Sequence, residues 1–153
     1  MPISNNYIKF KFVCHSKSED KWEEGGNRLL DPKNINGLEK SSDGKYILDC
    51  VWNHYKINFN IHYVLNPGAY MRLVVGTNEA DFQKKEETPL KMELKNSKEI
   101  TAIDGNKIKG FWSLTVLFKN TDKDFIYRYS IYDPKNGALW EREPNRRLRL
   151  FFS

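Results

Sequence analysis

The sequence predicts an all-β domain, an antiparallel sandwich of short strands, and three observations support this class. Short runs of β-branched and aromatic residues recur along the chain and mostly alternate in polarity, which is typical of strands that bury one face. The breaks between them carry the turn sequences Asn-Pro-Gly, Asp-Gly and Asp-Pro-Lys-Asn-Gly. No stretch longer than about two turns has the period of an amphipathic helix.

Six segments are expected to form strands: residues 8–13 (IKFKFV), 57–64 (INFNIHYV), 70–76 (YMRLVVG), 111–118 (FWSLTVLF), 125–132 (FIYRYSIY) and 147–152 (RLRLFF). The stretch 81–109 is rich in Lys and Glu, and we expect it to be irregular, with one short strand near LKMEL. Residues 31–45 have the composition of a linker.

The charge of the chain does not by itself indicate a nucleic-acid partner. The 25 Lys and Arg residues are interspersed with 20 Asp and Glu residues, which leaves a formal net charge of +5. A nucleic-acid surface usually gathers its basic residues on one face. The densest basic cluster lies near the C-terminus, at Arg142, Arg146, Arg147 and Arg149. On a strand Arg147 and Arg149 share one face, which favours an ordinary solvated edge.

Several functional classes lack a sequence signal. Cys14 and Cys50 fit no zinc spacing, and we interpret them as reduced core or strand residues. No secretory signal pattern and no apolar run of membrane-spanning length is present, so a cytosolic protein without membrane contact is expected. The histidines are scattered and form no catalytic or metal-ligating pattern. The sequence predicts a binding module with no catalytic residue, metal or cofactor.

An internal repeat relates the two ends of the chain. FKFVCHSKSEDKWEEGGNRLL near the start and YRYSIYDPKNGALWEREPNRRL near the end share an aromatic strand, a polar turn, Trp-Glu and Asn-Arg. A constant offset relates four pairs of residues: Trp22 and Trp140, Glu23 and Glu141, Asn27 and Asn145, and Arg28 and Arg146. The same hairpin is therefore expected twice.

The repeat suggests three parts: a terminal hairpin at residues 1–30, a linker at 31–50 and a complete module at 51–153. An isolated hairpin is marginal in water. The first part must therefore pack on the second domain, self-associate with another chain, or be the end of a truncated preceding module. We favour the last interpretation.

The residues of the repeat resemble a known family. FIYRYSIYDPKNGALWEREPNR resembles the closing strands of family-20 starch-binding modules, and NFNIHY, RLVVGT and FWSLTVLF resemble earlier strands in the same order. The resemblance covers roughly residues 56–152. It implies an immunoglobulin-like sandwich of about seven to eight strands that binds α-1,4-glucan (starch, glycogen or maltodextrin) without catalysis. DGKYILDCVWN resembles the join between tandem modules that precede cytosolic disproportionating 4-α-glucanotransferases, which implies a glucan-active domain outside this chain.

The resemblance also implies a set of glucan-binding residues. Trp140, Glu141 and Asn145 match the family's motif directly, Arg128 stands where a Lys is usual, and Phe82 takes the place of a second Trp. Trp22, Lys11 and Asn27 are the corresponding residues of the first hairpin, and we expect that copy to be vestigial.

These residue types suit a sugar. A flat aromatic ring buries the C–H face of a pyranose at roughly 25 cal/mol per Å², while nearby Asn, Glu and Arg side chains hydrogen-bond the hydroxyl rim. A Trp in a sandwich is more often a core residue, and we expect that role for Trp112. The alternative function is a sandwich that binds nucleic acid or protein through the C-terminal Arg cluster. Steep salt dependence would distinguish nucleic-acid binding from glucan binding.

Overall fold

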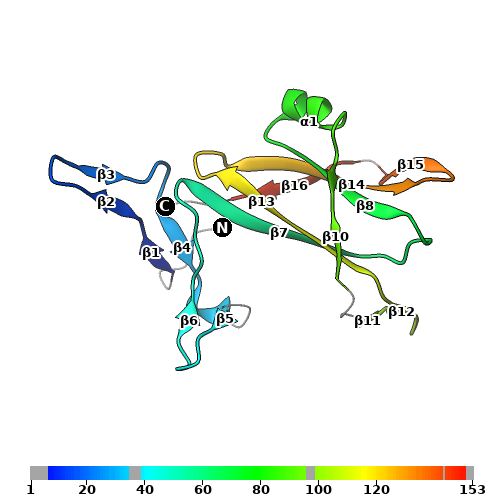
Figure 1. Ribbon diagram of the computed structural model, residues 1–153, viewed down its shortest axis with the longest axis horizontal. Helices are drawn as coiled ribbons and strands as arrows, with labels where there is room; N and C mark the ends of the chain where they lie inside the picture. Colours follow the sequence, from blue (N-terminus) through cyan, green and yellow to red (C-terminus); the bar gives the residue numbers. More distant parts are fainter. Residues whose placement is uncertain (1–6, 35–38, 96–98, 143, 151–153) are drawn as a thin grey trace. The chain divides into compact units, whose positions relative to one another are not determined.

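The computed structural model describes residues 7–34, 39–95, 99–142 and 144–150 (Figure 1). These residues form two compact units. The first contains the described residues up to Lys56 together with Leu117–Thr121, and the second contains Ile57–Val116 and Asp122–Leu150.

The second unit is built on two antiparallel sheets. One sheet has the strand order β10 (Glu93–Lys95), β13 (Phe111–Lys119) and β7 (His54–His62). The other has the order β15 (Gly137–Trp140), β14 (Asp124–Asp133), β8 (Tyr70–Gly76) and β9 (Leu90–Lys91), and β16 (Arg146–Arg149) also pairs with β14. The predicted all-β sandwich is confirmed. Residues 151–152 of the last predicted strand lie outside the described residues.

Strand β14 determines which side chains face the core. Its residues pair in register with β8, for example Tyr127 with Val75 and Tyr129 with Leu73. Directly paired residues in an antiparallel sheet share a face, so these side chains form one row. The ring centroid of Phe59, on β7, lies 5.1 Å from that of Tyr127. The odd-numbered residues of β14 therefore form the inner face of the sandwich, and the even-numbered residues form the outer face.

Trp112 lies in the core of this unit, as the sequence predicts. It is buried on β13, and its indole Nε1 donates to the main-chain carbonyl of Tyr63 at 3.0 Å. A buried indole N–H usually needs such an acceptor.

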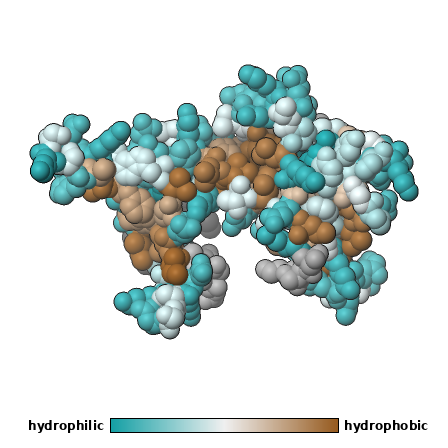
Figure 2. All heavy atoms as spheres, viewed as in Figure 1, coloured by the Kyte–Doolittle hydropathy of each residue, from teal (hydrophilic) through white to brown (hydrophobic). Residues whose placement is uncertain are grey.

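A short helix covers one end of the outer face. Helix α1 (Glu79–Lys85) begins at Asn78, whose Oδ1 accepts from the Asp81 N–H at 2.9 Å. Its single buried side chain, Phe82, packs with Val74 and Ile126. Figure 2 shows hydrophilic side chains over α1 and a band of hydrophobic residues beneath it. A Cβ on Gly76 would lie 2.5 Å from the Phe82 nitrogen, so only glycine allows this close approach.

The predicted irregular stretch 81–109 contains several short elements. It begins within α1 and then carries β9 and β10, which together cover the predicted strand near LKMEL and are interrupted at Met92. A further small hairpin follows, formed by β11 (Ile100–Thr101) and β12 (Lys107–Ile108). No described helix has the length and apolar character needed to cross a membrane.

The first unit consists of short strand pairs. β1 (Ile8–Phe10) pairs with β4 (Arg28–Leu30), and β2 (Val13–His15) pairs with β3 (Asp20–Trp22). The predicted linker contains a 3₁₀ turn, η1 (Pro32–Asn34), and a hairpin of β5 (Glu39–Lys40) and β6 (Tyr46–Ile47). Cys14 and Cys50 are free, and Cys14 is exposed on β2.

The two repeat segments have the same strand pairing. In the first unit Phe10 pairs with Arg28 and Val13 with Trp22. In the second unit Tyr127 pairs with Arg146 and Ser130 with Trp140. β1 and β2 together therefore correspond to β14, β3 corresponds to β15, and β4 corresponds to β16.

Replacement of Phe82 by alanine is expected to lower the free energy of unfolding by about 3–5 kcal/mol, because a large core side chain is lost and leaves a cavity. Urea denaturation measures the change. Leu139→Ala is the control: Leu139 is 64% exposed, and its loss should cost less than about 1 kcal/mol. Equal effects of the two substitutions would contradict the buried position of Phe82.

Candidate functional site

Trp140 lies at the end of β15, on the outer face of the five-stranded sheet. It pairs with Ser130, and its ring is half-buried against the Val74, Phe82 and Ile126 cluster. The side chain is therefore held in place by the core beneath α1 while part of its surface stays accessible. A stacking platform needs both properties.

Four further side chains extend this surface across the sheet. The register forms one row of Lys91, Arg72, Ser130 and Trp140, and a second row of Tyr70, Tyr132 and Ala138. Alternate residues of a strand share a face, so both rows face outward. We call the side chains of five of these residues the outer platform: Trp140, Arg72, Tyr132, Tyr70 and Lys91.

Cationic side chains lie against the aromatic rings of the outer platform. The Arg72 guanidinium carbon lies 5.7 Å from the ring centroid of Trp140 and 5.4 Å from that of Tyr132. Its Nη2 donates to Ser130 Oγ at 2.8 Å, which fixes the guanidinium between the rings. The Tyr70 and Tyr132 rings are 5.4 Å apart, and Lys91 Nζ lies 4.5 Å from the Tyr70 ring. Such contacts hold rings in defined orientations.

Two of the predicted site residues lie on this face but are buried. Phe82 is 2% exposed and belongs to the core under α1, so its ring has no free face for a sugar. Arg128 is 9% exposed on β14, two residues from Ser130. Phe82 supports Trp140 from below and is not a second stacking ring in this structure. Tyr132, which was not predicted, is 37% exposed, so its ring is accessible on this face.

Glu141 lies on the opposite face from Trp140. Its N–H donates to the Tyr129 carbonyl at 3.1 Å, which continues the ladder by one residue and carries the side chain to the inner face. The Arg146 Nε donates to both carboxylate oxygens at 3.0 Å, Nη2 donates to Oε2 at 2.6 Å, and the guanidinium lies 5.4 Å from the Tyr129 ring centroid. We call Glu141, Arg146 and Tyr129 the C-terminal clamp. Its carboxylate braces Arg146 and does not flank the indole.

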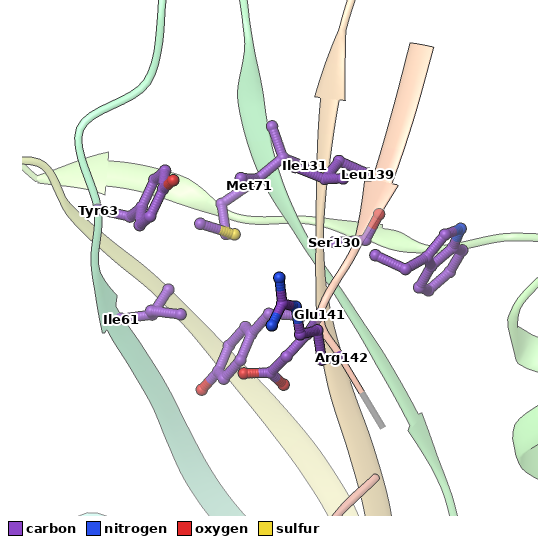
Figure 3. A pocket seen from close by; sticks show the side chains of 10 residues that line it. Ile61, Tyr63, Met71, Ser130, Ile131, Leu139, Glu141 and Arg142 are labelled. Atoms are coloured by element: carbon purple, nitrogen blue, oxygen red, sulfur yellow. The ribbon is translucent and has the colours of Figure 1, made fainter. Parts of the chain in front are cut away.

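A cleft adjoins the C-terminal clamp (Figure 3). It has a volume of about 350 Å³ and lies in the second unit. Ile61 and Tyr63 line one side, Met71, Ile131 and Leu139 line the other, and Glu141 and Arg142 lie at its polar end. Tyr63 is 48% exposed. The inner face of the sandwich is therefore accessible here and mostly apolar.

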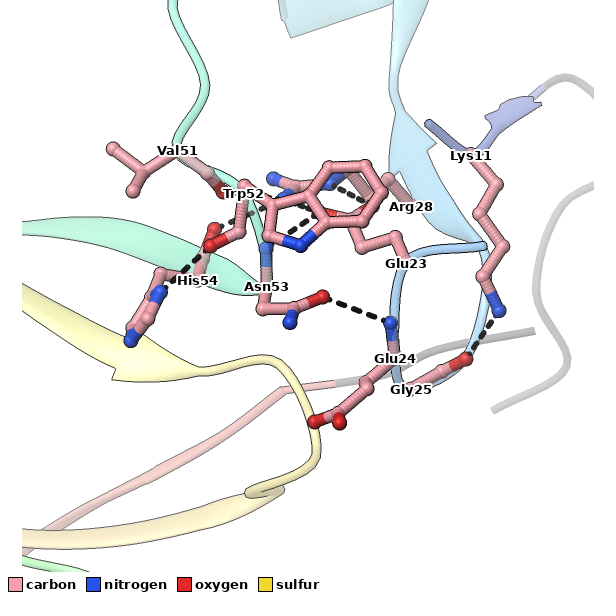
Figure 4. Close-up of polar contacts among 9 residues, drawn as sticks. All are labelled: Lys11, Glu23, Glu24, Gly25, Arg28, Val51, Trp52, Asn53 and His54. Atoms are coloured by element: carbon pink, nitrogen blue, oxygen red, sulfur yellow. Dashed lines mark hydrogen bonds and ion pairs between the residues drawn. The ribbon is translucent and has the colours of Figure 1, made fainter. Parts of the chain in front are cut away.

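The first unit contains an equivalent clamp whose ion pair is buried (Figure 4). The Arg28 guanidinium forms two hydrogen bonds with the Glu23 carboxylate, and it lies 5.3 Å from the Phe12 ring centroid. We call Glu23, Arg28 and Phe12 the N-terminal clamp. The side chains of Glu23 and Arg28 are 0% and 5% exposed. In both copies the glutamate N–H also donates to the carbonyl of the clamp's aromatic residue at 3.1 Å.

The remaining predicted residues are not gathered into a site. Trp22 is 59% exposed on β3. Lys11 Nζ donates to the Gly25 carbonyl at 2.6 Å, so it holds the loop between β3 and β4 (Figure 4). Asn27 and Asn145 are half-buried, and Asn145 Oδ1 is a buried atom that has no hydrogen-bond partner among the described residues. Asn145 precedes Arg146 in the segment between β15 and β16.

Most of the C-terminal Arg cluster is paired with carboxylates. Arg147 Nη2 donates to Glu79 Oε1 at 3.0 Å, and Arg149 Nε donates to Asp124 Oδ1 at 2.9 Å. Arg146 is held by Glu141 as described. Within the residues that the structure describes, no three His, Cys, Asp or Glu side chains form a group that could hold a metal ion.

Hydrogen bonding within the clamps shifts the carboxyl pKa values. Arg28 lowers the pKa of Glu23, the Asn53 N–H adds to the effect, and burial opposes it. Arg146 lowers the pKa of Glu141 in the same way. Burial raises the pKa of Tyr129 to about 12, so its ring is neutral beneath the Arg146 guanidinium.

Comparison of the chain with protein-family models, with curated proteins and with solved structures finds no match.

Glu23→Gln is expected to destabilise the protein by about 3–5 kcal/mol, because it leaves the Arg28 charge buried without a counter-charge. The corresponding substitution in the C-terminal clamp, Glu141→Gln, should cost less than about 1 kcal/mol, because Arg146 is half exposed. Urea unfolding of both variants tests this difference. A larger loss for Glu141→Gln would contradict it.

Stability should also fall on acidification. Glu23 has a lowered pKa in the folded protein, so its contribution is complete above the ordinary glutamate pKa of about 4.3 and is lost as the pH falls through the lower folded value. Unfolding free energies measured from pH 6 downward should decline below about pH 4.3. The decline should be shallower for Glu23→Gln. If this variant showed the same dependence of unfolding free energy on pH as the wild type, Glu23 would not be a cause of the acid destabilisation.

Proposed function

We propose that this protein binds α-1,4-glucan without catalysis through the outer platform. The proposal rests chiefly on one observation: Trp140 is held half-exposed by the core beneath it, and Arg72 links it to the exposed Tyr132 ring. The motif resemblance around Trp140 selects the class of sugar. Tyr132 replaces Phe82 as the second ring in this proposal, and Glu141 acts as a bracing residue.

The chemistry of the outer platform suits a neutral, hydrated ligand. Trp140 and Tyr132 offer apolar ring faces to the C–H faces of successive glucose units. Arg72 and Lys91, which lie against these rings, supply hydrogen-bond donors to the hydroxyl rim. Arg72 is already positioned by Ser130, so little side-chain entropy is lost on binding. Binding at one such site is weak, and linked modules would strengthen it by avidity.

The proposed cellular role rests on the resemblance to tandem starch-binding modules that precede 4-α-glucanotransferases. The module would hold an attached or partner enzyme, such as a cytosolic 4-α-glucanotransferase, on starch, glycogen or maltodextrin. This role requires no catalytic residue or cofactor in the present chain.

The alternative function, nucleic-acid binding by the C-terminal Arg cluster, has less support. Arg146, Arg147 and Arg149 each form an ion pair with a carboxylate. A phosphate would have to displace these partners, which reduces the free energy gained on binding.

Titration with maltoheptaose, followed by Trp fluorescence, tests the proposal. We expect saturable binding that changes little between low and high salt. Stacking that buries on the order of 80 Å² of apolar surface is worth about 2 kcal/mol at roughly 25 cal/mol per Å², so Trp140→Ala should weaken binding by about thirtyfold. Tyr132→Ala should weaken it by a smaller factor.

Trp22→Ala is the matched control, because Trp22 is the repeat counterpart of Trp140 and is 59% exposed. It should leave the affinity unchanged. Absence of binding by the folded wild-type protein, or equal losses in the Trp22 and Trp140 variants, would contradict the proposal. Strongly salt-dependent binding to an oligonucleotide instead would favour the Arg cluster.

A further inference from the structure

The N-terminal clamp holds a loop of the main chain that leads into β7. Arg28 Nη2 donates to the carbonyls of Val51 at 2.8 Å and His54 at 3.0 Å (Figure 4). Glu23 Oε1 accepts from the Asn53 N–H at 3.0 Å. The clamp therefore recognises a loop through two carbonyls and one N–H, which are available in a peptide of almost any sequence.

Two side-chain features of the loop complete the contact. Asn53 Oδ1 accepts from the Glu24 N–H at 2.9 Å, and Asn53 has a φ of 60°, a left-handed conformation that asparagine adopts more readily than most residues. The Tyr55 ring centroid lies 4.9 Å from the Arg28 guanidinium carbon. Arg28 is thus stacked between Phe12 of its own clamp and Tyr55 of the bound loop.

The C-terminal clamp has the same kinds of residues that hold the loop in the first unit. Arg146 uses the same two nitrogens, Nε and Nη2, to hold Glu141. Tyr129 occupies the position of Phe12, and Arg142 occupies that of Glu24. The bound loop has no counterpart among the described residues: the side chain of Arg146 is 50% exposed, whereas that of Arg28 is 5% exposed.

The cleft beside the C-terminal clamp provides space for a loop. Its lining is apolar along Tyr63, Met71 and Leu139, and its polar end carries Glu141 and Arg142. Those two residues correspond to Glu23 and Glu24, which supply the acceptor and the N–H that hold Asn53 in the first unit. The accessible space and the hydrogen-bonding groups therefore lie together.

We propose that the C-terminal clamp and the adjoining cleft bind a loop of another protein module. The loop would turn at an asparagine, present two main-chain carbonyls to Arg146 and one N–H to Glu141, and carry an aromatic residue two positions after the asparagine. Most of the outer platform lies on the opposite face of the sheet, but Trp140 also lines the cleft, so the loop site and the proposed glucan site share this residue.

The probe for this site is a synthetic peptide with the sequence of residues 48–57 carrying Cys50→Ser. It is titrated into the full-length, ¹⁵N-labelled protein, and the N–H resonances are followed by NMR to millimolar peptide. We expect saturable shifts at the main-chain N–H groups of Glu141 and Arg142 and at the Arg146 side-chain Nε–H. Absence of shifts, or shifts confined to Glu23, Glu24 and Arg28, would overturn the proposal.

Matched variants separate recognition from folding. Arg146→Gln should weaken peptide binding by at least about tenfold, because it removes the charged donor. Arg147→Gln, one position along β16 and paired with Glu79, should not. A peptide carrying Asn53→Pro, which lacks the N–H, should also bind at least about tenfold more weakly to the unchanged protein. Equal binding of the Asn53→Pro peptide and the parent peptide would contradict the proposal that the loop is held through its main-chain N–H.

The oligomeric state tests the identity of the partner. Sedimentation of the free protein should show a monomer over the same concentration range. Self-association that Arg146→Gln abolishes would instead identify a second copy of this chain as the occupant and overturn the assignment to another module.

Discussion

The register of β14 is the constraint on which the rest of the second unit depends. β14 pairs with β8 along one edge and with β15 and β16 along the other, so its side chains alternate between the core and the outer face. Trp140 and Glu141 are adjacent in the chain, yet this pairing directs them to opposite faces. A slip of one residue in β15 would place the indole on the inner face and the Glu141 side chain on the outer face.

The alternation of side chains between the two faces of a strand is a local pattern, and such patterns are what the sequence could predict. Strand segments, turns and the repeated hairpin depend on local patterns, and the predicted sandwich agrees with the structure. The site was harder to predict. The resemblance placed Phe82 at the position of a second Trp, but α1 directs its side chain onto Val74 and Ile126. Arg72 and Tyr132 join Trp140 only through the pairing of β8, β14 and β15, which no local pattern reveals. The sequence did carry one signal for this surface: strands in which a basic residue alternates with aromatic residues.

The two clamps show how burial changes the energetic role of the same ion pair. Glu23 and Arg28 are almost completely removed from water, so their charges must be matched, and Arg28 Nη2 also donates to the carbonyls of Val51 and His54. Glu141 and Arg146 keep partial solvent contact, and water screens their attraction. The same pair of residue types therefore anchors a loop in the first unit, whereas in the second unit it stays partly open to solvent.

The position of each clamp in its hairpin explains why both copies have it. β3 ends at Trp22 and β4 begins at Arg28, while β15 ends at Trp140 and β16 begins at Arg146. In each case the glutamate follows the last residue of one strand, and the arginine is the first residue of the next. The ion pair thus bridges the interruption and keeps both strands in register on one partner edge. Because this bracing needs no ligand, the clamp can remain in a copy whatever its neighbouring tryptophan binds.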